Sequence, residues 1–164
     1  MSTALPEWFY PGPEGGWTAE MLDHLPPDTP PHVELIDGSL VMRSPQTGFH
    51  MLTLRLLEQS PRPPHSFVVA REMAVTLGLR QRPEPDILLV KRSALESNVT
   101  TFQPEDVHLV VEVVSEESRD RDRTTKPIKY SDAAASARLH SPPRSHFFHL
   151  GFRLSLWRPL APSD

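Results

Sequence analysis

The fold of this chain follows from two apolar segments, Asp86-Ile-Leu-Leu-Val90 and His108-Leu-Val-Val-Glu-Val-Val114. Both are nearly continuous runs of branched aliphatic residues, which is typical of strands that are covered on both faces. Each segment carries an acid, Asp86 at the start of the first and Glu112 inside the second. Burying a carboxylate among valines costs free energy unless it pairs with a cation or binds a metal. The segments therefore predict core strands whose acids have a chemical role.

Local patterns predict the elements around these strands. Asp37-Gly38 separates two apolar runs, and this dipeptide favours a hairpin turn with positive φ at both positions. Thr18 can cap a short helix that ends near Leu25, and Pro127 is tolerated only in the first turn of a helix. We expect an α/β domain with a mixed β-sheet core built around residues 33–43, 66–77, 86–90 and 108–114, flanked by helices near 48–59 and 122–133.

The length of 164 residues suits one domain with a hydrophobic core. Residues 1–16 are rich in proline and glycine, which predicts a flexible N-terminal arm. Residues 17–135 form the predicted domain. Residues 136–150 show neither helical nor strand periodicity, and Gly151 to Trp157 is only weakly strand-like. We therefore expect residues 136–164 to be an unpatterned tail that is disordered or not native to the domain.

Composition narrows the classes of function. The chain has no cysteine, which excludes disulfides and thiolate metal sites. No apolar stretch approaches the roughly 18 residues of a membrane span, and the acidic, proline-broken start is not a signal peptide. We therefore expect a cytoplasmic protein with no membrane partner. The net charge of −4 gives no general attraction to nucleic acid, so any DNA contact requires a local patch.

The acids and a lysine suggest metal-assisted hydrolysis of a phosphodiester, in which a divalent ion neutralises charge and activates water. Mg²⁺ (or Mn²⁺) prefers oxygen ligands and keeps several waters. Asp86 and Glu112 would supply two carboxylates, and the carbonyl of Val113 could be a third ligand. Lys126 would orient the attacking water or stabilise developing charge. Glu34 is a candidate extra acid.

Several motifs occur together in a characteristic order. They are Glu34-Leu-Ile-Asp-Gly-Ser-Leu-Val41, His50, Arg82-Pro-Glu-Pro-Asp-Ile-Leu-Leu-Val90, Val111-Glu-Val-Val-Ser115 and the spacing of Asp122, Lys126 and Tyr130. This order, over roughly residues 17 to 132, resembles the bacterial putative restriction endonuclease family of the PD-(D/E)XK nuclease superfamily. The superfamily's lysine usually stands two residues after the second acid, where this chain has Val114. In the family that the chain resembles, the lysine lies on the following helix.

The resemblance implies a restriction-endonuclease-like mixed sheet and makes residues 17–135 a nuclease-like domain. It implies Mg²⁺-dependent cleavage of DNA, with Asp86 and Glu112 as metal ligands, Lys126 as the catalytic lysine and Glu34 as an auxiliary acid. A homodimer would suit such an enzyme, because cutting a duplex often takes two active sites.

Other interpretations stay open. The family's helix is followed by a core strand that the tail does not suggest, which favours an inactive or truncated remnant acting as a nucleic-acid- or protein-binding module. The chain could also be a protein-interaction domain with purely structural acids. Each residue has a simpler alternative: a turn cap for Asp86, an edge strand facing water for Glu112, a solvated face for Glu34 and Lys126, a surface or capping position for His50, and core packing for Tyr130.

Overall fold

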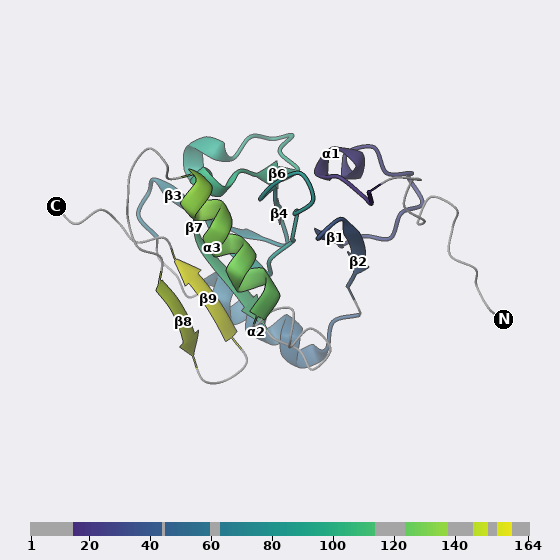
Figure 1. The fold of residues 1–164 in the computed structure, drawn as a ribbon. Coiled ribbons are helices and arrows are strands. Elements are labelled where there is room, and N and C mark those ends of the chain that lie inside the picture. The colour runs from purple at the N-terminus through teal and green to yellow at the C-terminus, as the bar shows by residue number, and fades with distance from the viewer. Residues whose placement is uncertain are drawn as a thin grey trace.

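The structure, a computed structural model, describes residues 15–43, 45–59, 63–113, 124–137, 146–150 and 154–158 (Figure 1). Its centre is a five-stranded antiparallel sheet in the order β3-β5-β7-β9-β8. These strands are β3 (Phe67–Arg71), β5 (Ile87–Lys91), β7 (Val107–Val113), β8 (His146–Leu150) and β9 (Leu154–Arg158). The two acid-bearing segments therefore pair directly, and β7 is the central strand. The predicted α/β class, a sheet core flanked by helices, is confirmed.

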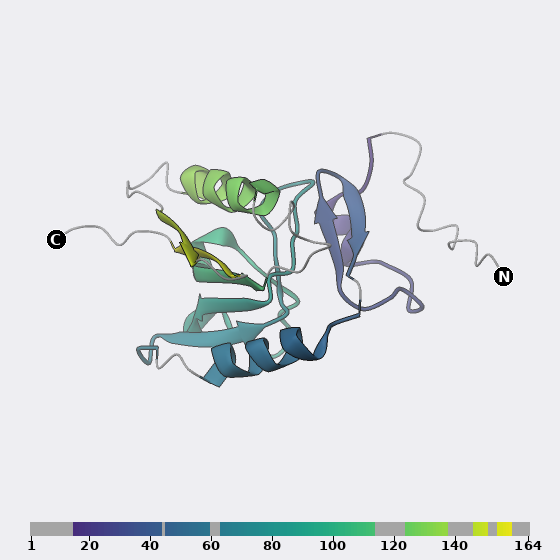
Figure 2. The same cartoon turned by 90° about the horizontal axis from the view of Figure 1, so that it is seen from below.

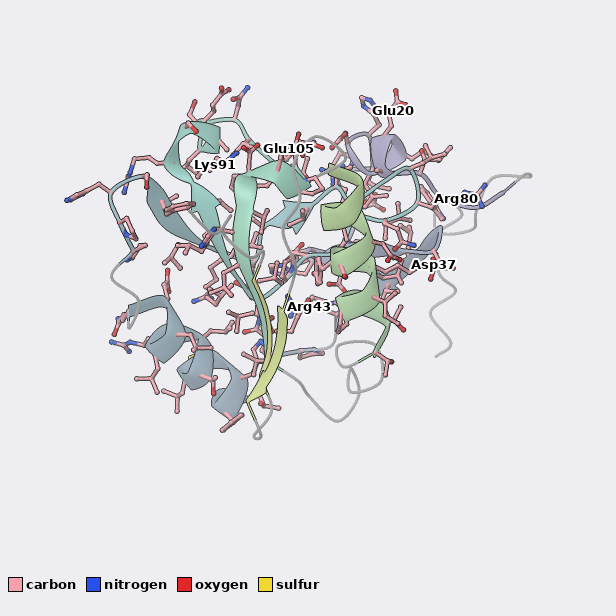
Figure 3. All side chains as sticks on the ribbon, turned by 60° about the vertical axis from the view of Figure 1, so that its left-hand side comes forward. Glu20, Asp37, Arg43, Arg80, Lys91 and Glu105 are labelled. Atoms are coloured by element: carbon pink, nitrogen blue, oxygen red, sulfur yellow. The ribbon has the colours of Figure 1, made fainter. Side chains whose placement is uncertain are left out.

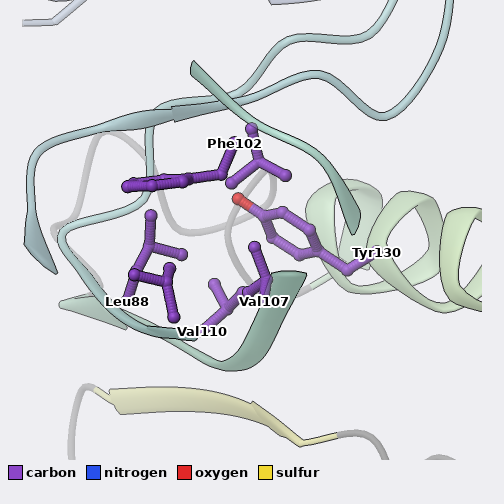
Figure 4. Close-up of a cluster of buried hydrophobic side chains, with 7 residues drawn as sticks. Leu88, Phe102, Val107, Val110 and Tyr130 are labelled. Atoms are coloured by element: carbon purple, nitrogen blue, oxygen red, sulfur yellow. The ribbon is translucent and has the colours of Figure 1, made fainter. Parts of the chain in front are cut away.

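Two long helices cover opposite faces of this sheet, α2 (Gly48–Gln59) and α3 (Lys126–Ala137) (Figure 2). The α2 bounds are those that the apolar spacing predicts. Because successive strand residues point to opposite faces, β5 and β7 feed two separate cores. The core that contains α3 consists of Val75, Leu88, Val90, Phe102, Val107, Val110 and Tyr130 (Figure 4). The core that contains α2 consists of Leu54, Ile87, Val111 and Val113.

The predicted hairpin is present as β1 (Val33–Ile36) and β2 (Ser39–Met42). Its turn residues both have positive φ, 50° at Asp37 and 78° at Gly38, as the Asp-Gly dipeptide favours. The hairpin forms its own two-stranded sheet beside α1 (Ala19–Leu22), so its expected place in the main sheet is wrong. The β-bridge between Leu35 and Arg82 and the hydrogen bond from the Gly38 N–H to the Arg80 carbonyl are among the contacts that link it to the segment leading into β5.

The segment 66–77 is not one strand. Glu72 has a φ of 51°, a left-handed conformation that breaks the extended chain. Beyond this break, β4 (Ala74–Val75) pairs in parallel with β6 (Thr101–Phe102) in a separate small sheet. Two short 3₁₀ helices, η2 (Arg92–Ala94) and η3 (Pro104–Asp106), complete the connection from β5 to β7.

Two strands lie within residues 136–164, where the sequence shows no clear pattern. β9 pairs with β7, and β8 pairs with β9, so the sheet continues beyond α3. In β9 the polar Ser155 separates Leu154 and Leu156, a short alternation that suits a strand. Ser136 and Ala137 end α3. Residues 138–145, 151–153 and 159–164, and residues 1–14 of the predicted arm, lie outside the described residues. Among the helices that are described, none has the length and apolarity needed to cross a membrane.

Candidate active site

The pairing of β5 with β7 brings Asp86 and Glu112 together. Ile87 pairs with Val111, so one step further along these antiparallel strands Asp86 lies opposite Glu112. Directly opposed side chains share a face of the sheet. The Val113 N–H donates a hydrogen bond of 2.6 Å to Asp86 Oδ2. With exposures of 1% and 2%, Asp86 and Glu112 are both buried, so Glu112 is not an edge-strand residue facing water.

Helix α3 supplies two polar groups to Glu112. Lys126 lies in its first turn and Tyr130 one turn later, a spacing that puts both on one side of the helix. Lys126 Nζ is 3.1 Å from Glu112 Oε1, and the Tyr130 hydroxyl donates to the same oxygen over 3.1 Å. Tyr130 is thus more than a packing residue, although its ring does lie among apolar side chains (Figure 4).

The hairpin supplies the third acid. Glu34 on β1 is fully buried, and its Oε1 lies 2.6 Å from Lys126 Nζ. The same oxygen accepts a hydrogen bond of 3.0 Å from the Glu84 N–H. Lys126, with 2% exposure, therefore bridges Glu34 and Glu112. The solvent-facing alternatives for Glu34 and Lys126 are wrong.

Two further residues contact Asp86 and were not predicted. Arg43, directly after β2, pairs through Nη2 with Asp86 Oδ1. His50, in the first turn of α2, places Nε2 3.3 Å from the same oxygen. Their side chains are 16% and 12% exposed, so the interpretation of His50 as a surface histidine is wrong. His50 is one of the features that carry the family resemblance, which could have drawn attention to it, whereas no sequence signal marks Arg43.

The pKa values of Asp86 and Glu84, which are two residues apart, shift in opposite directions. Burial acts to raise the pKa of Asp86, but the nearby His50 imidazole, the charge of Arg43 and the Val113 N–H outweigh it and lower that pKa. Burial dominates at Glu84 and raises its pKa, despite an ion pair with His32. Asp86 is therefore held as a carboxylate.

The pKa of Arg43 shows that three acids act on its guanidinium. Burial acts to lower the pKa of the Arg43 guanidinium, but three carboxylates, those of Asp86, Glu112 and Glu34, raise it well above its usual range. All three acids are thus within electrostatic reach of a single cation. The site concentrates negative charge at one end of β5 and β7.

The donor set suits a hard divalent ion. Within the described residues, no cluster of three or more acidic or histidine side chains is arranged to hold a metal. Two carboxylates, from Asp86 and Glu112, with a backbone carbonyl such as that of Val113 and water, match the preference of Mg²⁺ for oxygen ligands. One of the Asp86 oxygens, Oδ1, is engaged by Arg43. The segment Arg119-Asp-Arg-Asp-Arg123, which precedes α3, lies outside the described residues.

The chain matches a known protein family. A family model named Uma2, described as putative restriction endonuclease, matches residues 19–137. This is more than half of the chain, and it includes the hairpin, α2, the β5–β7 pair and α3. A search of curated proteins finds no match.

Proposed function

Since the chain belongs to the Uma2 family of putative restriction endonucleases, within the PD-(D/E)XK-like nuclease superfamily, we propose that it is a metal-dependent DNA endonuclease. The ion is Mg²⁺ or Mn²⁺, and the reaction is hydrolysis of a phosphodiester bond. The observation that carries the proposal is the buried Lys126, 3.1 Å from Glu112 and 2.6 Å from Glu34. Such an arrangement is costly to bury and needs a reason beyond packing.

Each residue has a role in this proposal. Asp86 and Glu112 hold the ion, with the Val113 carbonyl as a further ligand. When bound, the ion neutralises charge on the phosphate and lowers the pKa of its water. Lys126 keeps a positive charge beside the reacting phosphate and orients the attacking water. Glu34 fixes the position of the Lys126 ammonium.

Two further hydrogen bonds keep the acids in place. The Tyr130 hydroxyl fixes one oxygen of Glu112, and the Val113 N–H fixes one oxygen of Asp86. Both contacts come from regular elements, α3 and β7, which hold side chains more rigidly than loops do. The metal ligands are thereby held in place before any ion enters.

The proposal includes a partner and a compartment. DNA is the substrate, a homodimer would present two sites to a duplex, and the cytoplasm supplies both DNA and Mg²⁺. Sedimentation of the purified chain alone and with a short duplex tests the assembly. A monomer that cuts both strands would remove the homodimer from the proposal.

The first experiment compares wild type with Asp86→Asn and Glu112→Gln for plasmid cleavage in Mg²⁺ or Mn²⁺. A parallel thermal melt measures metal binding, since a ligand at about 100 times its Kd stabilises the folded state by about 2.7 kcal/mol. We expect wild type to cut DNA and to melt at a higher temperature with metal, and both variants to lose both responses.

The matched control is Glu105→Gln, which removes an exposed carboxylate on η3 (Figure 3). It should behave as wild type. A cooperative wild-type melt that is indifferent to metal, without cleavage, would refute the endonuclease. Metal and DNA binding without cleavage would instead establish an inactive nuclease-like binding module.

A further inference from the structure

Arg43 occupies the side of Asp86 that a metal ion would need. Its Nη2 pairs with Oδ1, while the other carboxylate oxygen, Oδ2, accepts the Val113 N–H over 2.6 Å. That contact ties the Asp86 side chain to the backbone at the end of β7. The contact at Oδ1 is made by side chains alone, from Arg43 and His50.

We propose that Arg43 is an internal counter-ion that a divalent cation must displace from Asp86, so that this arginine sets the affinity of the chain for metal. The inference rests on the proposed metal site. It adds a residue to that site and assigns it a regulatory role, since Arg43 stabilises the metal-free chain and opposes metal entry.

Electrostatics favour displacement. Arg43 Nη2 pairs with Asp86 Oδ1, an oxygen that an ion bound to Asp86 would have to share with it. A divalent ion on that oxygen would therefore lie at contact distance from the guanidinium. Like charges at contact distance in a buried site are strongly repulsive, so the ion and the guanidinium are alternatives.

Arg43 is the cation that can leave. Lys126 is 2% exposed and is held between two acids, whereas the Arg43 side chain is 16% exposed. A second acceptor also lies beside it. Arg43 Nη1 is 3.5 Å from the Glu84 carbonyl oxygen and 4.0 Å from Glu84 Oε1. A small rotation of the guanidinium therefore exchanges Asp86 for Glu84.

The test is a titration of Mn²⁺ into the metal-free chain, followed by calorimetry and by the electron paramagnetic resonance signal of free Mn²⁺. We expect Arg43→Gln to bind Mn²⁺ roughly tenfold more tightly or better than wild type, because it removes the repulsive charge. It should melt at a lower temperature in chelator and gain more from metal. The control Arg55→Gln removes the same charge from an exposed position on α2 and should match wild type.

The outcomes separate this inference from the proposed function. Equal or weaker Mn²⁺ binding by Arg43→Gln, while wild type binds, overturns the role of Arg43 and leaves the nuclease site standing. Binding by Arg43→Gln alone supports the role of Arg43 and counts against activity of the natural chain. Binding by neither protein overturns both.

A measurement on wild type covers the case in which Arg43→Gln does not fold. The guanidinium nitrogen resonances of isotopically labelled chain report rotation about the Cζ–Nε bond. We expect the Arg43 signal to show hindered rotation in chelator and faster rotation in saturating Mg²⁺. An Arg43 signal that Mg²⁺ leaves unchanged, while signals from the Asp86 segment shift, would overturn the proposal.

Discussion

Helix α3 touches the hairpin through two lysines, and the two contacts differ in burial but not in length. Lys126 Nζ lies 2.6 Å from Glu34, and Lys129 Nζ lies 2.6 Å from Asp37. The side chains of Lys126 and Glu34, the inner pair, are 2% and 0% exposed. Those of Lys129 and Asp37, the outer pair, are 30% and 58% exposed. Two ion pairs of equal length therefore sit in very different surroundings.

The comparison teaches that burial, and not distance, decides what such a pair does. Water and salt screen the outer pair, and exposed pairs contribute only about 0.2–1 kcal/mol. Removing one partner of a buried pair leaves an uncompensated charge and costs about 3–5 kcal/mol. The inner pair thus holds the hairpin against α3 and positions Lys126 beside Glu112. The outer pair adds little to the stability of this contact.

The largest effect is expected for Lys126→Met, which keeps the length of the side chain but removes its charge. Glu34 and Glu112 then lose their shared cation, so the free energy of unfolding at neutral pH should fall by about 3–5 kcal/mol. Urea denaturation measures this loss. DNA cleavage should disappear as well if Lys126 acts on the reacting phosphate.

The second variant, Lys126→Met combined with Glu34→Gln, separates charge from packing. Removing one of the two orphaned acids should restore part of the stability while cleavage stays absent. If the free energy of unfolding of Lys126→Met alone lies within about 1 kcal/mol of the wild-type value, the Lys126 pair contributes no more than an exposed ion pair does. That result would end the distinction between the inner and outer contacts.

A smaller effect is expected for Tyr130→Phe. The ring stays in its apolar cluster, but Glu112 loses a hydrogen bond of 3.1 Å. Hydrogen bonds to charged groups contribute about 1.5–3 kcal/mol. Thermal melts should show this loss, and Mn²⁺ affinity should fall because Glu112 is less well oriented. Unchanged stability and affinity would mean that Lys126 alone positions Glu112.

The inner contact was partly predictable. Glu112 among valines indicates a buried acid with a partner, and Asp37-Gly38 indicates the turn that presents Glu34. Lys126 was predicted as the lysine that accompanies the two acids, and the resemblance to a family implied that it is the catalytic lysine. The charged surroundings of Lys126 suggested a solvated helix face, and nothing local in the sequence reports that the hairpin covers it.

The residues around Asp86 show where sequence reasoning stops. Arg43 lies 43 positions from Asp86, and ion pairs of this kind depend on how β2 and α2 pack rather than on any local pattern. The break at Glu72 is similar, because a positive φ at a glutamate has no compositional signal. Periodicity predicts elements, but these contacts arise from their packing.

The smallest effect, and the direct counterpart of the first, is expected for Lys129→Met. It removes a cation from the same helix and breaks an ion pair of the same length, but the stability loss should be only about 0.2–1 kcal/mol. That loss should vanish at about 1 M salt, where the Debye length is about 3 Å. Urea denaturation of Lys126→Met and Lys129→Met at low and high salt measures the contrast directly.

The stability difference between wild type and Lys129→Met should also depend on pH, in a direction that the pKa of Asp37 predicts. The hydrogen bond from Lys129 lowers the pKa of Asp37 below its ordinary value of 3.8. A lowered pKa means that the pair stabilises the folded chain above about pH 4 and loses this contribution as Asp37 is protonated at lower pH. Wild type and Lys129→Met should therefore differ slightly near neutral pH and converge below pH 4. A difference that persists in acid, or that survives high salt, would show that the outer pair acts through packing and that exposure alone does not separate the two lysines.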